Sequence, residues 1–299
     1  MRLALFVLVA GLLDWGVGWV LSRLYFRQRS GTFAQCTYIM DGVKDPVLIV
    51  GSSRALHHYI STVLSDSLRR PCFNAGRDGQ GVIFYDAVLQ QVFARYKPDL
   101  VVLDLNPREL EPESKSYDRL SELLPYLHTH PTLQRVVDLR GPFERLKRIS
   151  RIYPYNSMLF AIVLHNLPQQ LGAKRERGFL PLYGHAPGHR APTGEHARLS
   201  AHHVDPLKVA ALLHIVEIVR TSGCRLCVVV SPTLSIDRSE EPRELIAKLL
   251  AQADVPFWDY SGDPNFLRNA YLFYDESHLN VTGARRFSRL IAARLVATR

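Results

Sequence analysis

The chain alternates short apolar runs with helical segments, and this alternation most constrains its fold. Val47–Val50 and Leu100–Leu105 are continuous apolar runs, typical of strands buried on both faces of a parallel sheet. Between them, Ala55–Leu68 has apolar residues at three- and four-residue steps, as a helix does, and Val82–Phe93 is a second predicted helix. A βαβ order of this kind predicts a parallel sheet with helices on both faces.

Similar signals continue in the C-terminal half. The remaining predicted strands are Cys72–Asn74, Leu226–Val230 and Phe257–Asp259. The remaining predicted helices are Pro206–Val219, Glu244–Ala253 and Gly283–Val296. We therefore predict an α/β fold, a three-layer α/β/α domain with a parallel, flavodoxin-like sheet. In such sheets the functional residues lie beyond the carboxyl ends of the strands.

The N-terminal segment has a different character. Leu3–Leu21 is 19 residues long and apolar apart from Asp14, which is long enough to cross a bilayer as a helix. Asp14 costs about 3 kcal/mol near the bilayer centre, but eleven Leu, Val and Phe residues return about 0.3–0.6 kcal/mol each. We expect an uncleaved membrane anchor and juxtamembrane segment over 1–30, followed by one domain over 31–299. A buried N-terminal helix is the alternative.

Residues 111–204 interrupt the strand–helix alternation. The stretch is rich in His, Tyr and Pro and too long for a plain loop, so we predict a cap-like insertion. Phe143–Ile152 and Ser157–Leu167 are its expected helices. The spacing of its eight histidines matches no metal-ligand motif.

Composition argues against several function classes. The net charge of +9 suggests nucleic acid, but the basic residues are scattered and no basic cluster is interleaved with aromatics. Cys224 and Cys227 have Cys-x-x-Cys spacing without a second pair of ligands. Gly76–Gly81 does not match the Gly-x-Gly-x-x-Gly pattern of dinucleotide sites. We expect no cofactor, no metal and no nucleic-acid partner.

Two short motifs at opposite ends of the chain carry the chemistry. Gly51-Ser52-Ser53 follows the first predicted strand, and Asp275 and His278 precede the last helix. A serine, an imidazole that takes its proton and a carboxylate that orients the imidazole form a nucleophilic hydrolytic centre. Singly, each residue has another explanation, because Ser53 could cap a helix and Asp275 could cap the last one.

With these motifs the chain resembles the SGNH (GDSL-type) hydrolase superfamily, especially its membrane-anchored bacterial members, over about residues 45–110 and 225–295. The resemblance implies that Ser53 is the nucleophile, with His278 as base and Asp275 as its partner. It also implies an oxyanion site made by the amides of Ser53 and Gly76 and the side chain of Asn106. The implied reaction is hydrolysis or transfer of an O-acyl ester.

Two positions depart from the family pattern. Asp104 stands where the third block has glycine, and Ser52 stands where the first block has aspartate. The second departure resembles proteins that acylate envelope polysaccharides and teichoic acids, and this implies a cell-envelope glycan ester as substrate. A catalytically inactive protein that binds envelope glycan or a partner on the same scaffold is the alternative.

A second hydrolase family matches less well. Gly51–Ala55 nearly fits the nucleophile elbow of α/β-hydrolases, but that fold places its serine after several strands and its acid far from the histidine.

The topology signals conflict. Arg23, Arg27 and Arg29 follow the apolar segment and only Arg2 precedes it, so charge bias favours a cytoplasmic domain. The family resemblance implies an extracytoplasmic, periplasmic one. We expect a single-pass membrane protein with an exported domain, and the cytoplasmic face of the membrane is the alternative.

Overall fold

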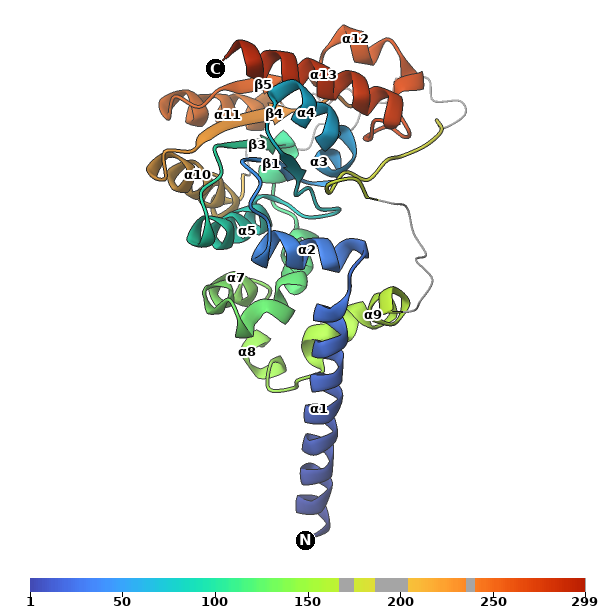
Figure 1. Cartoon of the computed structure of the whole chain (residues 1–299). Helices are drawn as coiled ribbons and strands as arrows, with labels where there is room; N and C mark the ends of the chain where they lie inside the picture. The colour runs from blue at the N-terminus through green and yellow to red at the C-terminus, as the bar shows by residue number, and fades with distance from the viewer. Residues whose placement is uncertain (167–174, 186–203, 235–239, 299) are drawn as a thin grey trace. The chain divides into compact units, whose positions relative to one another are not determined.

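The computed structural model describes residues 1–166, 175–185, 204–234 and 240–298. The chain packs as two compact units (Figure 1), of which one comprises Met1–Gly42 with Glu113–Gly172 and the other Val43–Pro112 with Ala173–Arg299. The second unit contains the sheet. The predicted insertion, residues 111–204, is therefore divided between the two units.

The sheet has five parallel strands in the order β2-β1-β3-β4-β5. Their bounds are Val47–Gly51 (β1), Cys72–Asn74 (β2), Leu100–Asp104 (β3), Arg225–Val230 (β4) and Phe257–Asp259 (β5). This is the flavodoxin-like order of doubly wound sheets, so the predicted fold class is confirmed. Gly51 pairs in register with Asp104, which brings the carboxyl ends of β1 and β3 together.

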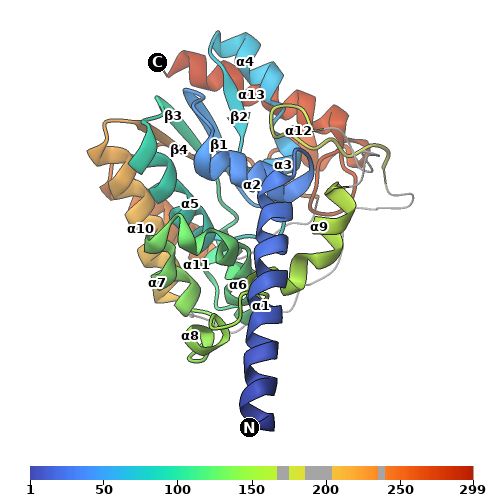
Figure 2. The same cartoon turned by 60° about the horizontal axis from the view of Figure 1, so that its bottom comes forward.

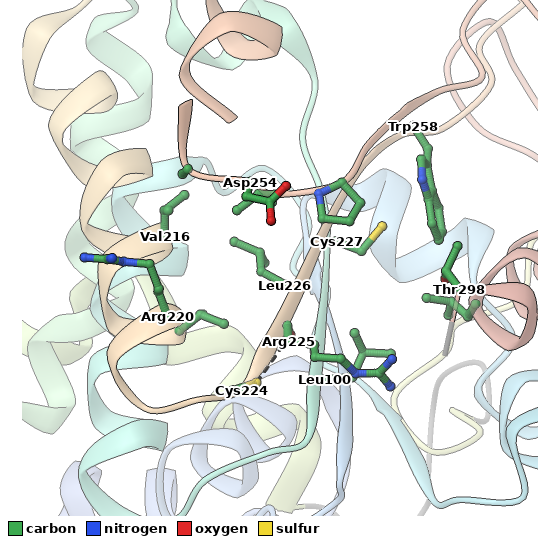
Figure 3. Close-up of a pocket in the computed structure, with 15 residues that line it drawn as sticks. Leu100, Val216, Arg220, Cys224, Arg225, Leu226, Cys227, Asp254, Trp258 and Thr298 are labelled. Carbon is green, nitrogen blue, oxygen red and sulfur yellow. Dashed lines mark hydrogen bonds between the residues drawn. The ribbon is translucent and has the colours of Figure 1, made fainter. Parts of the chain in front are cut away.

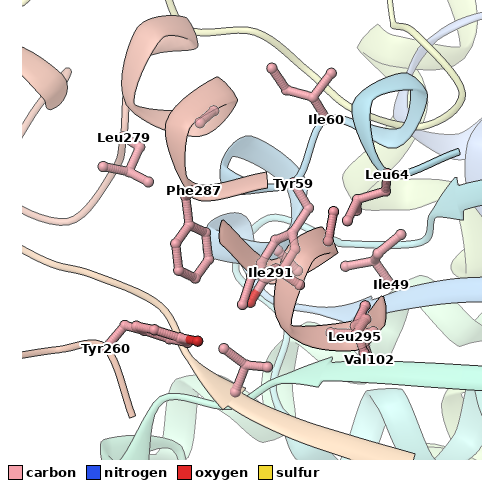
Figure 4. Close-up of a cluster of buried hydrophobic side chains, with 14 of the residues drawn as sticks. Ile49, Tyr59, Ile60, Leu64, Val102, Tyr260, Leu279, Phe287, Ile291 and Leu295 are labelled. Carbon is pink, nitrogen blue, oxygen red and sulfur yellow. The ribbon is translucent and has the colours of Figure 1, made fainter. Parts of the chain in front are cut away.

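Helices cover both faces of this sheet. They are α3 (Ser53–His58), α4 (Ser61–Leu68), α5 (Val82–Arg95), α10 (Pro206–Thr221), α11 (Glu240–Gln252), α12 (Pro264–Leu267) and α13 (Val281–Ala297), with 3₁₀ turns η1 (Pro107–Leu110) and η5 (Ala270–Leu272). α3, α4 and α13 pack on one face and α5 and α10 on the other (Figure 1). Ile49 and Val102 of the sheet meet Tyr59, Phe287 and Ile291 in the core between sheet and helices (Figure 4).

The predicted helix over Ala55–Leu68 is two helices, and the break comes from distant residues. Asn74 Nδ2 donates to the carbonyls of Ala55 and Tyr59 at 2.7 and 2.9 Å. The Ile60 amide donates to Ser288 Oγ at 2.8 Å. These side chains replace the intrahelical bonds at the junction, so the chain turns between α3 and α4 without leaving buried backbone groups unpaired.

The other unit is built from helices and 3₁₀ turns. They are α1 (Arg2–Arg27), α2 (Gly31–Asp41), α6 (Ser114–Asp118), η2 (Arg119–His128), η3 (Pro131–Leu133), α7 (Gln134–Asp138), α8 (Glu144–Lys147), η4 (Tyr153–Met158) and α9 (Leu159–Asn166). Tyr25 of α1 is buried and donates to the Tyr126 hydroxyl at 3.0 Å. That hydroxyl also bonds Thr37 of α2 at 2.9 Å, so α1, α2 and η2 share one packed centre.

Within this unit α1 alone, among the helices that the structure describes, is long and apolar enough to cross a membrane. α9 lies beside it (Figures 1 and 2). The predicted helix over Phe143–Ile152 is wrong, because only α8 forms there. Residues after Lys147 instead turn toward α1, where Ser150 Oγ and the Arg151 amide donate to Asp14.

Candidate active site

Ser53 begins α3 directly beyond the carboxyl end of β1. Gly51, which ends the strand, has a φ of 150°, and a Cβ there would approach the Asp104 carbonyl to 2.5 Å. Glycine is therefore required where the chain turns from strand into helix. Ser52, not Ser53, is the residue at the N-cap position. The Ser53 side chain points elsewhere: its Oγ lies 2.7 Å from Nε2 of His278.

His278 and Asp275 lie in the loop before α13. Both carboxylate oxygens of Asp275 lie 2.9 Å from Nδ1 of His278, on the ring edge away from Ser53. The amides of Ser277 and His278 each donate to the same carboxylate at 2.8 Å. Burial opposes ionisation of Asp275, but these hydrogen bonds prevail and lower its pKa. The structure thus brings Ser53, His278 and Asp275 into one hydrogen-bonded row.

His58 holds the loop that carries His278. Its Nε2 accepts from the Leu279 amide at 3.0 Å, so its Nδ1 carries the proton and donates to Ser231 Oγ at 2.9 Å. The ring is fully buried. Burial, together with the nearby charges of His278 and Arg54, lowers its pKa well below the usual value. His58 is therefore a neutral, fixed ring that ties α3 to the residue after His278.

His57 also contacts the His278 ring. The two rings meet edge to face with centroids 5.4 Å apart. Nδ1 of His57 bonds the Leu180 carbonyl at 2.7 Å, and Nε2 lies 3.3 Å from Asp78. Burial opposes the charge of Asp78, but His57 and nearby arginines lower its pKa. A histidine–carboxylate pair therefore borders this edge of the site.

Gly76 lies next to the start of α3, where any side chain would collide with the Leu56 backbone. Its amide already donates to Asn74 Oδ1 at 2.8 Å. The neighbouring amides of Ala75 and Arg77 donate to the carbonyls of Ile49 and Gly51 at 2.7 and 2.9 Å. This bonding fixes the loop against β1, and it competes with the oxyanion role predicted for Gly76.

Asn106 follows β3 and caps η1. Its Oδ1 accepts from the Arg108 amide at 3.2 Å, while its own amide donates to Glu109 at 3.3 Å. This capping box fixes the rotamer of Asn106 and leaves its Nδ2 to donate. Gly51 and Asp104 pair at the ends of β1 and β3. Ser53 comes two residues after Gly51 and Asn106 two residues after Asp104, so both follow neighbouring strand ends.

Asp104, the departure in the third block, has a structural explanation. Its carboxylate is buried and accepts from the Tyr59 hydroxyl at 2.6 Å, while an Arg54 nitrogen lies 3.4 Å away. A glycine could not make these contacts. These contacts connect β3 to α3 beside Ser53. They also give Arg54, which directly follows the candidate nucleophile, a structural role as the partner of Asp104.

Other predicted features lie away from this cluster. Cys224 and Cys227 are free and buried, and burial raises the pKa of each thiol to about 12. They line a pocket of about 240 Å³ at the starts of β3 and β4, opposite the carboxyl ends (Figure 3). His189, His196, His202 and His203 lie outside the described residues. Among the described ones, no group of three His, Cys, Asp or Glu side chains could hold a metal.

Sequence reasoning missed His57, His58, Arg54, Tyr59 and Glu109. The available signal was polar residues inside otherwise apolar segments. Arg54, His57 and His58 occur in one turn of a buried helix, and Asp104 ends a buried strand. Buried polar side chains need partners, so these residues were candidates for a network around Ser53.

No protein-family model matches the chain, and no curated protein matches it in sequence. Among solved structures it is similar to a "putative acylhydrolase" from Bacteroides fragilis NCTC 9343, at 13% sequence identity and a TM-score of 0.41. The similarity covers 84% of this chain and 86% of that one. At this level it carries no conclusion about activity, so the geometry above is the basis for function.

Proposed function

We propose that the protein is a serine-dependent O-acyl esterase or acyltransferase of the SGNH type. The observation that carries the proposal is the 2.7 Å contact between Ser53 Oγ and His278 Nε2, with Asp275 on the opposite ring nitrogen at 2.9 Å. A nucleophile, a base and an orienting acid within hydrogen-bond reach are the parts that acyl transfer requires.

In the proposed reaction, Ser53 Oγ attacks the ester carbonyl carbon while His278 Nε2 takes the hydroxyl proton. Asp275 stabilises the resulting imidazolium. When the tetrahedral intermediate collapses, the bond to the leaving alkoxide breaks and His278 returns the proton to it. Water or a sugar hydroxyl, deprotonated by His278, then attacks the carbonyl carbon of the acyl-serine. The bond to Ser53 Oγ breaks, His278 returns the proton to that oxygen, and the acyl group leaves on the acceptor. Hydrolysis and transfer differ only in this acceptor.

The oxyanion needs hydrogen-bond donors near Ser53. The Ser53 amide is among the helix-start amides without an intrahelical acceptor, and Asn106 Nδ2 is the second proposed donor. Gly76 would contribute only if its amide were shared with Asn74. Losing one such donor costs about 100- to 1000-fold in rate, so Asn106→Ala should lower kcat by that factor.

The bonded amide of Gly76 also favours a second candidate function. A chain with an incomplete oxyanion site would bind an acylated glycan or a protein partner without turning it over. The same constellation of Ser53, His278 and Asp275 would then serve only to hold the loops in place.

The activity of two neighbouring serine variants separates these functions. With a small acetyl ester as substrate, we expect Ser53→Ala to abolish turnover and Ser52→Ala to keep most of it, because only Ser53 contacts His278. Wild-type protein that shows no turnover would favour the binding function. An inactive Ser52→Ala with an active Ser53→Ala would refute the nucleophile assignment.

We further propose that α1 anchors the protein in a membrane, with the sheet-containing unit on the extracytoplasmic side and a cell-envelope glycan ester as substrate. An anchored enzyme benefits most when its substrate lies at the same membrane. A phosphatase reporter fused after Arg299 should then be active. An inactive phosphatase fusion with a fluorescent cytoplasmic reporter fusion would place the domain in the cytoplasm.

A further inference from the structure

α1 is packed along one stripe of its C-terminal half and is bare elsewhere. Residues 1–13 are all exposed, whereas Gly18, Leu21 and Tyr25 are buried. These three follow at three- and four-residue steps, so they form one face of the helix. The other segments of the same unit therefore cover only this face, beginning near Asp14.

Asp14 marks the level at which packing begins. Ser150 Oγ donates to one of its carboxylate oxygens, and the Arg151 amide donates to the other at 2.6 Å. A side chain at Gly18, one turn further on, would collide with Arg151. Residues 150–152 therefore lie directly against α1 in the middle of its apolar stretch.

The bare part of α1 is too short to cross a bilayer. Residues 3–13 rise about 16 Å as a helix, while the hydrocarbon core is about 30 Å thick. Beyond Asp14 the uncovered face stays apolar, with Trp15, Val17 and Trp19 exposed. If α1 spans the membrane, these residues are at membrane depth, and so is the protein segment packed on the opposite face.

That segment exposes an unusual amount of apolar surface. Ile149 is 74% exposed and Phe160 is 80% exposed. We define the apolar platform as the exposed apolar side chains between residues 143 and 163. They form two groups, Phe143, Leu146 and Ile149 in and around α8 and Leu159, Phe160 and Val163 on α9, and these two helices lie on either side of α1 (Figures 1 and 2). Single exposed apolar residues are ordinary, but a group of them marks an interaction surface.

Charge around the platform complements a lipid headgroup layer. Arg145, Lys147, Arg148 and Arg151 lie in the same stretch, and Asp138, just outside it, pairs with Arg145 at 3.2 Å and with Arg148 at 2.7 Å. Its acid, Glu144, is buried and pairs with Arg140 at 2.7 Å and Lys147 at 2.9 Å. Apolar side chains beside an excess of Lys and Arg are the composition of segments that lie in a membrane interface.

We propose that the apolar platform inserts into the membrane interface beside α1. Residues 143–163 would then form a second lipid contact, in the leaflet that surrounds the C-terminal half of α1. The partner is an anionic phospholipid bilayer, because the platform flanks the apolar helix α1 and cationic side chains lie in the same stretch of chain. The inference rests on α1 crossing a membrane and not on the ester reaction. It also explains how Asp14 is tolerated, since protein donors surround its carboxylate at membrane depth.

Fluorescence from single cysteines in the full-length protein tests this. The chain would be reconstituted in phosphatidylcholine–phosphatidylglycerol vesicles with an environment-sensitive fluorophore on Ile149→Cys or Phe160→Cys. The four native cysteines are buried, and mock-labelled wild type measures their background. We expect emission at shorter wavelength than in water. Lipids brominated near the glycerol end should quench more than lipids brominated near the chain terminus, because interfacial segments lie about 5–10 Å deep.

Two control positions make the result decisive. Gln134→Cys is exposed in the same unit but outside the platform, and its fluorophore should report water. Leu5→Cys in the bare part of α1 lies near the other end of the span, and its fluorophore should also emit at short wavelength and be quenched by brominated lipid. Labels at 149 and 160 that behave like the one at 134, while the label at 5 is quenched, would overturn the proposal. A label at 5 that also reports water would overturn both the platform proposal and the proposed membrane span of α1. Labelling of Ser53 by an acylation probe would report the proposed activity separately.

Discussion

Glu109 predicts a specific pH dependence of stability. Its carboxyl is buried, and this burial, partly offset by Arg54 and by the bond from the Asn106 amide, raises its pKa from 4.5 to about 7. Below pH 4.5 the carboxyl is protonated in both the folded and the unfolded chain. Between pH 4.5 and 7 the unfolded chain releases the proton and the folded chain keeps it, so rising pH favours unfolding.

The size of this effect follows from the pKa. A carboxyl whose pKa rises from 4.5 to about 7 in the folded state costs about 3 kcal/mol of stability once pH exceeds 7. Glu109→Gln removes the titration while its side-chain oxygen can still accept from the Asn106 amide. The free energy of unfolding of the variant, relative to wild type, should therefore grow by about 3 kcal/mol between pH 4.5 and 8.

Urea unfolding of both full-length proteins in detergent micelles, repeated across this pH range, measures that difference. Any constant offset from replacing the carboxylate beside Arg54 does not alter the pH slope. A difference between the two proteins that stays flat from pH 4.5 to 8 would refute the buried, proton-holding carboxyl.

Three further variants probe the site. His58→Phe leaves the buried Leu279 amide without its acceptor, so kcat on a small ester should fall about 10- to 100-fold with little change in KM. Ser231→Ala keeps that acceptor, so its kcat should fall much less. Equal losses of kcat in the two variants would contradict the positioning role of His58. Asp275→Asn should lower kcat about 10⁴-fold at neutral pH, and near-normal kcat would remove Asp275 from the site. Gly51→Ala must adopt a φ of 150° close to the Asp104 carbonyl, so it should lose more than about 1 kcal/mol of stability, and an unchanged thermal midpoint would contradict that strain.

The parts of the fold that sequence predicts are those set by local patterns. Continuous apolar runs such as Val47–Val50 become strands at the expected positions, because a strand buried on both faces has apolar side chains at every position. Ser53, Asp275 and His278 come together because each follows or precedes an element whose position the parallel sheet determines.

The parts that sequence does not predict depend on partners far away in the chain. The helix break near Tyr59 needs Asn74 and Ser288, and helical periodicity over 55–68 carries no sign of either. The structural use of Asp104 depends on Arg54 and Tyr59 in the preceding helix. α8 ends early because residues 150–152 bond Asp14, more than a hundred positions earlier.

Covalent labelling of Ser53 tests the central claim most directly. The full-length protein would react with a fluorophosphonate probe, and the labelled peptide would be mapped by mass spectrometry, with His278→Ala as the matched control that removes the base. We predict that the label resides on Ser53, that Ser52→Ala still labels and that His278→Ala labels far more slowly. A wild-type protein that takes up no probe, or carries it on a serine other than Ser53, would contradict the proposed acyl-transfer centre.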